Sequence, residues 1–269
     1  FARRLARHNL VFYLAALAGT TLALAAVPAA ALRGAAGGWP AAAGLAALLF
    51  AATRPAFALV NWIATLLIPP RFLPSLDFSK GIPAEHRAIV VVPTFLGPPA
   101  SSARLLEDLE VRYLANPAPN LLFAVLTDFP DADAEELPTD RAWIEAALQG
   151  VRRLNARHAR GGEPVFFLLH RPRVWNPAEG KWMGRERKRG KLEGFNRLVV
   201  EGRTDAFSAI SGDPNALRSV RYVLTLDTDT QLPPGVAVRM VGAMAHLLNR
   251  PQLDPIRRLV VRGYAVLQP

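Results

Sequence analysis

Two carboxylates one residue apart follow an apolar run in the second half of the chain. Asp227 and Asp229 come directly after the run from Tyr222 to Leu226, which is typical of a buried strand. Ligands of open α/β sheets bind outside the carboxyl ends of the strands, so these acids are expected beside a ligand crevice. Carboxylate oxygens suit Mg²⁺ or Mn²⁺, and such ions leave room for substrate phosphates. We therefore expect Asp227 and Asp229 to hold Mg²⁺ or Mn²⁺.

An acid pair of this kind also has less specific interpretations. Surface carboxylates one residue apart are frequent, and only the preceding strand makes this pair informative. Hydrolases that form an aspartyl-phosphate also carry Asp-x-Asp after a strand. In their motif a Thr or Val follows two residues after the second acid, where this chain has Gln231. The pair therefore matches those hydrolases poorly.

Cations are concentrated between Glu186 and Asn196, in a segment that includes Arg187, Lys188 and Lys191. The segment is expected to begin a helix, and the free N–H groups and the dipole at a helix N-terminus attract anions. The alternative is a basic helix face in solvent, which is the usual role of such a charge run. Its place between two predicted strand ends favours the anion site.

Two further strands are expected to end in polar residues. Pro93 and Thr94 follow the apolar run 88–92, and Asp128 follows the run 121–126. Because the carboxyl ends of parallel strands meet at one edge of a sheet, Thr94, Asp128 and the acid pair are expected to lie together. That edge is where the sequence predicts the ligand site.

Strand-like runs alternate with helix-like segments, which favours an α/β fold with a largely parallel sheet and right-handed crossovers. The expected strands are 88–92, 121–126, 165–169, 220–226 and 259–267. The expected helices are 101–114 (capped by Ser101 or Ser102), 140–160, 185–200 and 233–248. Residues 170–184 form a long aperiodic loop, of a length that is usually functional or disordered, and its tryptophans Trp175 and Trp182 argue against disorder.

Residues 1–70 hold two long apolar stretches. Leu10 to Leu32 matches the ~20 residues needed to cross a bilayer, and Ala41 to Leu67 follows closely. A cleaved signal peptide is the alternative for the first stretch, but the second stretch follows too closely for that. Arg54 either snorkels within one long span or separates a span from an interfacial helix at 56–68. The basic N-terminus indicates that both it and residues 71–269 face the cytoplasm.

Composition sets further bounds. The 269 residues include 32 Lys and Arg against 22 Asp and Glu, a net charge of +10. That excess favours phosphate-bearing partners or anionic lipid, or it reflects the cytoplasmic loops of a membrane protein. The absence of cysteine excludes disulfides, thiolate metal sites and cysteine nucleophiles. The few histidines have no His-x-x-x-His spacing, which argues against a zinc hydrolase.

The chain resembles the glycosyltransferase region of bacterial cyclic β-1,2-glucan synthases, over residues 55–269. The matching segments, in chain order, are Leu73 to Pro83, Val90 to Thr94, Leu126 to Phe129, His170 to Arg173 with Trp175 to Pro177, Trp182 to Gly184, Arg187 to Leu192, Thr225 to Pro233 and Arg262 to Tyr264. So many separate matches in one order make the resemblance specific. The two apolar stretches also fit, because this family is embedded in the membrane.

The resemblance implies an α/β, GT-A-like (Rossmann-like) and mostly parallel sheet, incomplete here and preceded by two transmembrane helices. Residues 1–70 would be the membrane segment, and residues 71–269 would be a glycosyltransferase domain truncated at its C-terminus. The implied activity is an inverting glucosyltransferase in the bacterial inner membrane, which uses UDP-glucose to build β-1,2-glucan that is closed into rings. Expected partners are UDP-glucose, the growing glucan chain, the lipid bilayer and the rest of the parent polypeptide, with no nucleic acid.

The resemblance also implies roles for single residues. Asp128 would bind the uridine, Asp227 and Asp229 would hold the metal and diphosphate, and Lys191 and Asn196 would line the nucleotide site. The remaining residues expected in the nucleotide-sugar site are Pro93, Thr94, Arg187 and Lys188.

The resemblance further implies that the general base lies beyond Pro269, so the fragment alone is expected to be inactive. The alternatives are a non-catalytic remnant, which binds a UDP-sugar or anchors to the membrane, and a processive synthase of another β-glucan. The segments Trp182 to Gly184 and Arg187 to Leu192 count against a cellulose or hyaluronan synthase.

Overall fold

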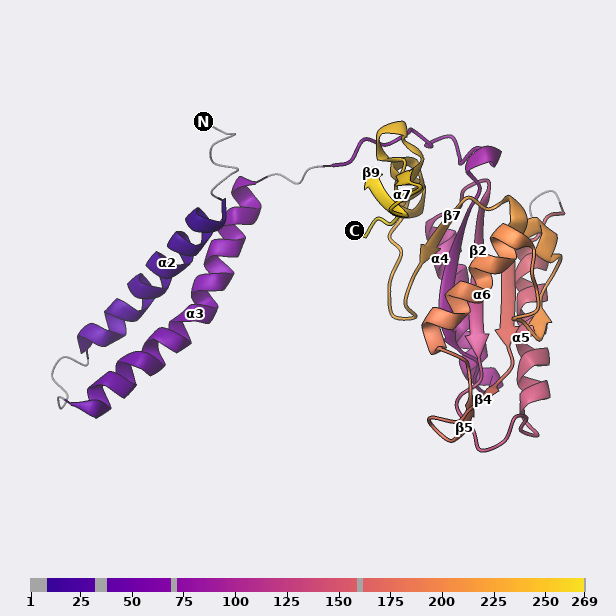
Figure 1. Ribbon diagram of the computed structural model, residues 1–269, viewed down its shortest axis with the longest axis horizontal. Coiled ribbons are helices and arrows are strands. Elements are labelled where there is room, and N and C mark those ends of the chain that lie inside the picture. The colour runs from indigo at the N-terminus through magenta and orange to yellow at the C-terminus, as the bar shows by residue number, and fades with distance from the viewer. Residues whose placement is uncertain (1–8, 32–37, 69–71, 159–161, 269) are drawn as a thin grey trace. The chain divides into compact units, whose positions relative to one another are not determined.

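The computed structural model describes residues 9–31, 38–68, 72–158 and 162–268. The chain divides into two compact units, Phe1–Phe72 and Leu73–Pro269, which are described separately below (Figure 1).

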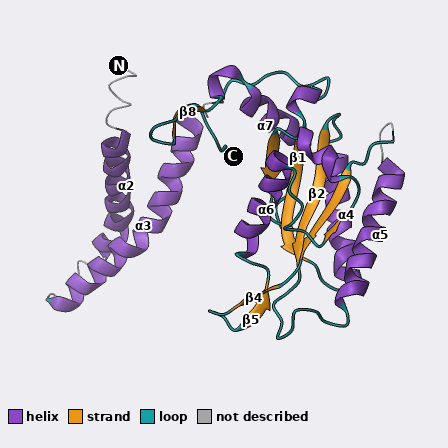
Figure 2. Cartoon of the chain, turned by 45° about the vertical axis from the view of Figure 1, so that its right-hand side comes forward, coloured by secondary structure: helices purple, strands orange, loops and turns teal. Residues whose placement is uncertain are grey.

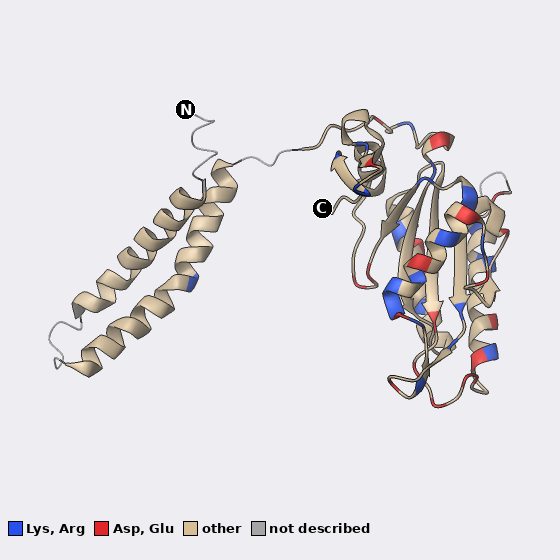
Figure 3. Cartoon of the chain, viewed as in Figure 1, with Lys and Arg blue, Asp and Glu red and all other residues tan. Residues whose placement is uncertain are grey.

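The described residues of the first unit form two helices, α2 (Asn9–Ala31) and α3 (Trp39–Leu67), which pack against each other. By length and composition both are able to cross a membrane. The hydroxyl of Tyr13 in α2 donates a hydrogen bond of 2.9 Å to the amide oxygen of Asn61 in α3. Arg54 is the only charged residue in the described part of this unit, and the two helices are otherwise tan in Figure 3.

Helix α3 runs without a break through Pro55, although proline removes one backbone hydrogen bond from a helix interior. The sequence left two arrangements open: one long helix that includes Arg54, or a span followed by a separate helix. The structure has the single long helix. A separate helix at 56–68 does not form in the described residues.

The second unit is built on a five-stranded sheet with the order β6-β3-β2-β1-β7 (Figure 2). The strands are β1 (Ala88–Phe95), β2 (Leu121–Asp128), β3 (Phe166–Arg171), β6 (Ala209–Ile210) and β7 (Tyr222–Thr225). Neighbouring strands are parallel except at β6, which runs antiparallel to β3. The expected α/β class with a mostly parallel sheet is confirmed.

Helices cover both faces of this sheet (Figure 1). They are α4 (Pro99–Ala115), α5 (Asp140–His158) and α7 (Val236–Ala245) on one face, with α6 (Arg187–Glu201) and the short 3₁₀ helix η3 (Pro214–Ser219) on the other. Alternate residues of each strand enter the two cores, so that Val90 packs with α4 and α5 while Val91 packs with α6. Burial on both sides explains why the strands are continuous apolar runs.

The strand expected at 259–267 is not part of this sheet, so that prediction is wrong. Residues Leu259–Arg262 form β9, which pairs antiparallel with β8 (Gln252–Asp254), and all four β9 residues are exposed. The Asp254 carboxylate accepts hydrogen bonds from the backbone N–H groups of Ile256 and Arg257. These bonds stabilise a turn directly after β8, so that β9 pairs with β8 and not with the sheet. The sheet gains β6 instead, a strand of two residues.

The expected serine cap of α4 is also wrong. The helix begins at Pro99, where a missing N–H is tolerated. The hydroxyls of Ser101 and Ser102 donate to the carbonyl oxygens of Pro98 and Gly97, each at 3.0 Å, and cap no helix N–H group.

The expected loop 170–184 contains a short hairpin. Its strands are β4 (Val174–Asn176) and β5 (Lys181–Met183), which place Trp175 opposite Trp182. The other helices agree with the sequence in type and shift by a few residues, and the predicted end of α5 at 159–160 lies outside the described residues. Two 3₁₀ turns, η2 (Ala84–His86) and η4 (Leu247–Asn249), complete the unit.

Candidate functional site

Three neighbouring strands, β1, β2 and β3, end at the same edge of the sheet. The sequence predicted this meeting for the ends of β1 and β2 together with the strand before Asp227, but not for the end of β3. Phe95 at the end of β1 lies opposite Asp128 at the end of β2, and Asp128 lies opposite Arg171 at the end of β3. Helix α6 begins at this edge, where Figure 3 shows Lys and Arg gathered at one end of the helix. The strand ends and the basic segment therefore meet.

Asp128 is the centre of a buried ion network. Its two oxygens accept hydrogen bonds of 2.8 and 2.9 Å from the Arg171 guanidinium, and Lys191 Nζ lies 3.1 Å from Oδ2. The Asp128 side chain is only 1 % exposed. Lys191 Nζ also donates a hydrogen bond of 2.6 Å to the carbonyl oxygen of Thr94 and lies 4.6 Å from the centre of the Phe95 ring. One residue from each of β1, β2 and β3 is thus tied to α6.

The charges of this network do not cancel, since one carboxylate faces two cations. Burial lowers the pKa of the Lys191 ammonium, and the neighbouring Asp128 carboxylate raises it again in part. Buried charges are tolerated only when they are paired and hydrogen-bonded. The edge therefore keeps a net positive charge beneath its surface, which suits an anionic ligand.

Two glycines allow the network to close. A Cβ atom at Gly184 would lie 2.2 Å from Asp128 Oδ2, and one at Gly190 would lie 2.1 Å from the carbonyl oxygen of Arg185. Arg171 also donates to the carbonyl oxygens of Arg185 and Arg187, at 3.1 and 3.2 Å. Only residues without a side chain fit at these two positions.

The turn that starts α6 is strained. Glu186 and Arg187 have φ angles of 51° and 46°, in the left-handed region that costs a residue with a side chain about 1–2 kcal/mol. The bond from Arg171 to the Arg187 carbonyl helps to hold this conformation. The Arg187 side chain pairs with Asp131 at 3.0 Å and with Glu179 at 3.3 Å. The same arginine that fixes Asp128 therefore also orients the basic helix start.

The acid pair Asp227 and Asp229 has a different environment. Both residues lie in the exposed segment after β7, and the Asp227 side chain is 60 % exposed. Asp227 pairs with Lys188 of α6, whereas the Asp229 side chain makes no hydrogen bond or ion pair in the described structure. The described residues contain no group of three or more His, Cys, Asp or Glu that could hold a metal ion by itself. Two exposed carboxylates, one of them paired only with a lysine, suit Mg²⁺ or Mn²⁺, which take one or two carboxylates together with substrate phosphates.

The expected site residues are therefore only partly gathered. Thr94 and Asp128 gather around Lys191 of α6, and Asp227 pairs with Lys188 of the same helix. The four others differ in their surroundings: Arg187 pairs with acids of neighbouring loops, Pro93 is buried within β1, and the side chains of Asn196 and Asp229 are exposed without a hydrogen bond to any described residue.

Sequence reasoning missed Arg171 and Phe95. It ended the third strand at Leu169 and the first at Val92, so both residues were assigned to loops. The strands continue to Arg171 and Phe95, which brings the guanidinium beside Asp128 and leaves the Phe95 ring 45 % exposed at the edge. The dipeptide His170-Arg171 after an apolar run was the available signal.

His170 lies behind this edge and stays neutral. Its Nδ1 is 2.9 Å from the Thr127 hydroxyl, and its ring packs edge-on against Phe129 with centroids 4.2 Å apart. Burial lowers the pKa of His170 to about 4, while nearby Asp128 and Asp140 raise it and Arg173 and Lys191 lower it. The buried Nε2 has no hydrogen-bond partner.

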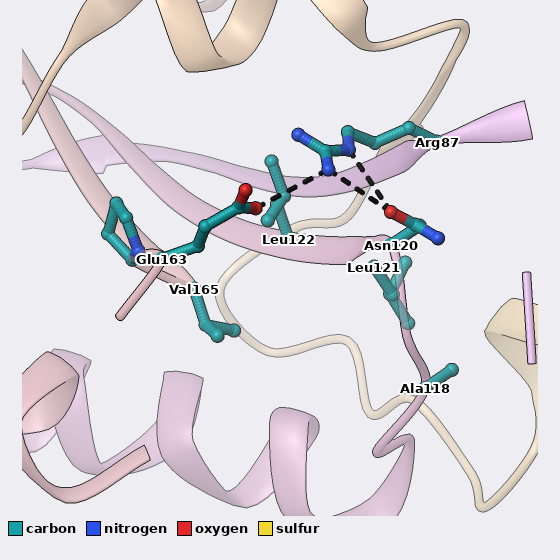
Figure 4. A pocket seen from close by; sticks show the side chains of 8 residues that line it. Arg87, Ala118, Asn120, Leu121, Leu122, Glu163 and Val165 are labelled. Carbon is teal, nitrogen blue, oxygen red and sulfur yellow. Dashed lines mark hydrogen bonds and ion pairs between the residues drawn. The ribbon is translucent and has the colours of Figure 1, made fainter. Parts of the chain in front are cut away.

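A small pocket lies at the opposite edge, beside the first residues of β1 and β2 (Figure 4). Arg87 crosses it and donates to the Asn120 amide oxygen at 3.1 and 3.3 Å, to Glu163 at 3.4 Å and to Ser219 at 3.2 Å. These bonds tie together the segments from which the strands start. The pocket is separate from the strand ends that carry Asp128.

The comparison with known proteins supports the predicted resemblance. Over 224 residues the chain is 42 % identical to the cyclic beta-(1,2)-glucan synthase NdvB of Rhizobium meliloti (strain 1021). The match covers 82 % of this chain but 8 % of that protein, so the chain spans less than a tenth of its relative. No family model matches the chain. The resemblance inferred from the sequence motifs is confirmed.

Proposed function

We propose that this chain, a homologue of one segment of a cyclic β-(1,2)-glucan synthase, is the nucleotide-sugar-binding part of a membrane-bound glucosyltransferase. Its donor is UDP-glucose, and its fold is of the GT-A type. The whole protein inverts the configuration at glucose and builds β-1,2-glucan that is closed into rings. The observation that carries the proposal is the meeting of cations, exposed carboxylates and strand ends at one edge of the sheet, in a chain with this homology.

The cationic part of the edge suits the diphosphate. Lys188 and Lys191 both rise from the first turns of α6, where the helix dipole and free N–H groups also attract an anion. The exposed Phe95 ring beside Lys191 offers an apolar face on which a planar base can stack. We assign the diphosphate to Lys188, assisted by the positive charge of Lys191, which is 3 % exposed, and the base to the end of β1.

The acid pair suits a divalent cation that is shared with the diphosphate. Asp227 and Asp229 would hold Mg²⁺ or Mn²⁺, and such an ion offsets the charge that develops on the departing UDP. Lys188 already pairs with Asp227, so a cation of the protein lies next to a carboxylate oxygen of the proposed metal site. Metal, diphosphate and Lys188 therefore belong to one region.

Asp128 has a less direct part in donor binding. Both of its oxygens are engaged by Arg171 and Lys191, so a contact with uridine requires one of these ion pairs to open. We propose that Asp128 acts first by fixing Lys191. Inversion also requires a carboxylate base for the acceptor hydroxyl, and we assign none within this chain.

The first unit anchors the enzyme. Helices α2 and α3 cross the bacterial inner membrane in this proposal, and the Arg residues before Asn9 keep the N-terminus and the second unit on the cytoplasmic side. The donor is then bound from the compartment where nucleotide sugars are made.

The proposal is tested by glucose transfer in membranes. Membranes that carry the full natural polypeptide are incubated with labelled UDP-glucose, and the linkage of the labelled glucan is determined. The expected product is β-1,2-linked, and Asp229→Ala abolishes its formation. Asp133→Ala is the control, because the Asp133 side chain is 95 % exposed and lies outside the site.

Two results would overturn the proposal. A labelled glucan of another linkage would assign the chain to a different synthase. UDP-glucose binding without any transfer by the full polypeptide would make it a non-catalytic binding module.

A further inference from the structure

The segment that carries both acids is exposed, yet buried side chains at the end of α4 hold its backbone. Residues 227–231, after β7, are all exposed, and the segment contains one turn, in which the N–H of Thr230 donates 3.1 Å to the Asp227 carbonyl. Its backbone nevertheless has several partners in the last turns of α4. These contacts form a set that serves this segment.

Arg112 of α4 makes the contacts closest to the acids. Its guanidinium donates one hydrogen bond of 2.7 Å to the carbonyl oxygen of Thr228 and two hydrogen bonds, of 3.0 and 3.2 Å, to the carbonyl oxygen of Thr230. Thr228 lies between the two acids, and Thr230 directly follows Asp229. A single side chain thus fixes the backbone on both sides of Asp229.

Asn116, the residue directly after α4, holds the chain that follows this segment. Its amide donates 3.1 Å to the Leu232 carbonyl and accepts 3.2 Å from the N–H of Ala237. The residue is 1 % exposed. Arg112 and Asn116 therefore attach the connection from β7 to α7 to the C-terminal end of α4.

The chemistry of Arg112 is unusual for a purely structural residue. It is 6 % exposed, and the described structure gives its guanidinium backbone carbonyls as partners but no carboxylate, with Nη1 unpaired. Burying a cation without an opposite charge is costly, and apolar packing would stabilise the helix at a lower cost. The planar guanidinium, however, holds two carbonyl groups at a fixed separation, which a lysine does not do.

We infer that Arg112 is a positioning residue for the acid pair. Mg²⁺ demands near-ideal octahedral geometry with oxygen ligands at about 2.0–2.1 Å, so its carboxylates must be held in place. By fixing the Thr228 and Thr230 carbonyls, Arg112 sets the backbone from which Asp227 and Asp229 project. This inference rests on the proposed metal role of the two acids.

The test is Mn²⁺ binding by the purified full chain in the presence of UDP, measured by electron paramagnetic resonance. Arg112→Lys keeps the charge but loses the two-carbonyl fork. The expected result is Mn²⁺ affinity weaker by about 10-fold or more, as for other residues that orient metal ligands, and a broader signal from the bound ion.

Arg173→Lys is the matched control. Arg173 is 3 % exposed and also donates to two backbone carbonyls, Pro130 at 2.7 Å and Glu135 at 3.1 Å, outside the acid segment. Unlike Arg112 it also forms an ion pair within the described residues, with Asp140 at 2.5 Å, so its replacement tests the loss of a buried arginine away from the acids. The Arg173→Lys variant is expected to have a lower melting temperature, with the affinity for Mn²⁺ and the signal of the bound ion unchanged. If an arginine variant fails to fold, Asn116→Ser is measured instead. This variant loosens the chain at Leu232 and Ala237, directly after the acid segment, and is expected to weaken Mn²⁺ binding as well.

The outcomes separate the two proposals. UDP-dependent Mn²⁺ binding that Asp229→Ala leaves unchanged would overturn the metal role and, with it, this inference. Loss in Asp229→Ala with wild-type binding in Arg112→Lys, or in a folded Asn116→Ser, would overturn the positioning role alone. Equal losses in Arg112→Lys and Arg173→Lys would also overturn it, because general destabilisation would then explain the effect.

Discussion

Asp128 and Asp227 are both acids at the ends of parallel strands, yet they have opposite environments. Asp128 ends the central strand β2, is 1 % exposed and faces two cations, Arg171 and Lys191. Asp227 follows the edge strand β7, is 60 % exposed and faces one lysine, Lys188. The position of a strand in the sheet therefore decides whether its terminal acid becomes part of the folded framework or stays available to a ligand.

The two environments imply different energies. An exposed ion pair stabilises a protein by about 0–1 kcal/mol, since solvent screens it. Removing one partner of a buried pair leaves an uncompensated charge and costs about 3–5 kcal/mol. The Asp128 network should therefore govern stability, and the acid pair should govern ligand binding.

The largest expected effect is that of Asp128→Ala. It leaves Arg171 and Lys191 buried without their carboxylate, so the free energy of unfolding should fall by about 3–5 kcal/mol. Urea denaturation followed by circular dichroism measures the change. Asp229→Ala, by contrast, should alter stability by no more than about 0.5 kcal/mol. Equal losses in the two variants would contradict the distinction between the two acids.

The next effect is a dependence on pH from His170. The folded protein binds a proton there with a pKa of about 4, and the unfolded chain with a pKa of 6.5. Neither form is charged well above pH 6.5, so stability is then unaffected. As the pH falls from 6.5 to 4, the unfolded chain takes up the proton first, and this histidine should cost the fold at most about 3 kcal/mol.

Denaturation of His170→Gln across this pH range isolates that contribution. The variant should lose the part of the pH dependence that His170 supplies, whereas His246→Gln, outside the Asp128 network, should keep it. An unchanged pH profile in His170→Gln would show that this buried ring does not titrate as described.

Gly184→Ala should have an intermediate effect on the same network. The new methyl group would lie 2.2 Å from Asp128 Oδ2, and such overpacking costs about 1–3 kcal/mol. Gly180→Ala is the comparison, because nothing lies within 4 Å of its Cβ position and only its positive φ is strained. A melting temperature no lower for Gly184→Ala than for Gly180→Ala would argue against the close approach.

The smallest expected effect on stability is that of Lys188→Ala. The side chains of Lys188 and Asp227 are both at least half exposed, so the free energy of unfolding should change by less than about 1 kcal/mol. Affinity for UDP should fall, and by more at low salt than at high salt. A stability loss as large as that of Asp128→Ala would remove the contrast between the two regions.

Much of the fold could be predicted because the signals are local. The runs that begin at Ala88 and Leu121 are buried on both faces, and such continuous apolar runs are recognisable in sequence. The hairpin that contains β9 was misassigned because its apolar run resembles a core strand. Its pairing depends on the turn after Asp254, which the run itself does not reveal.

The candidate site could be predicted in its residue types but not in its division into two regions. Strand order decides that Asp128 is central and Asp227 peripheral, and strand order is a property of the tertiary fold. The contacts of Arg171 with Asp128 and of Arg112 with Thr228 join residues 43 and 116 positions apart. No local pattern marks such partners.

The most direct test of the account is the affinity for UDP, measured by titration calorimetry with and without Mn²⁺ in the wild-type chain and in Asp229→Ala. We expect Mn²⁺ to strengthen UDP binding by at least about 10-fold in the wild type, which corresponds to 1.4 kcal/mol, and to have no effect in Asp229→Ala. Wild-type affinity that is independent of Mn²⁺, or an equal Mn²⁺ effect in Asp229→Ala, would contradict it.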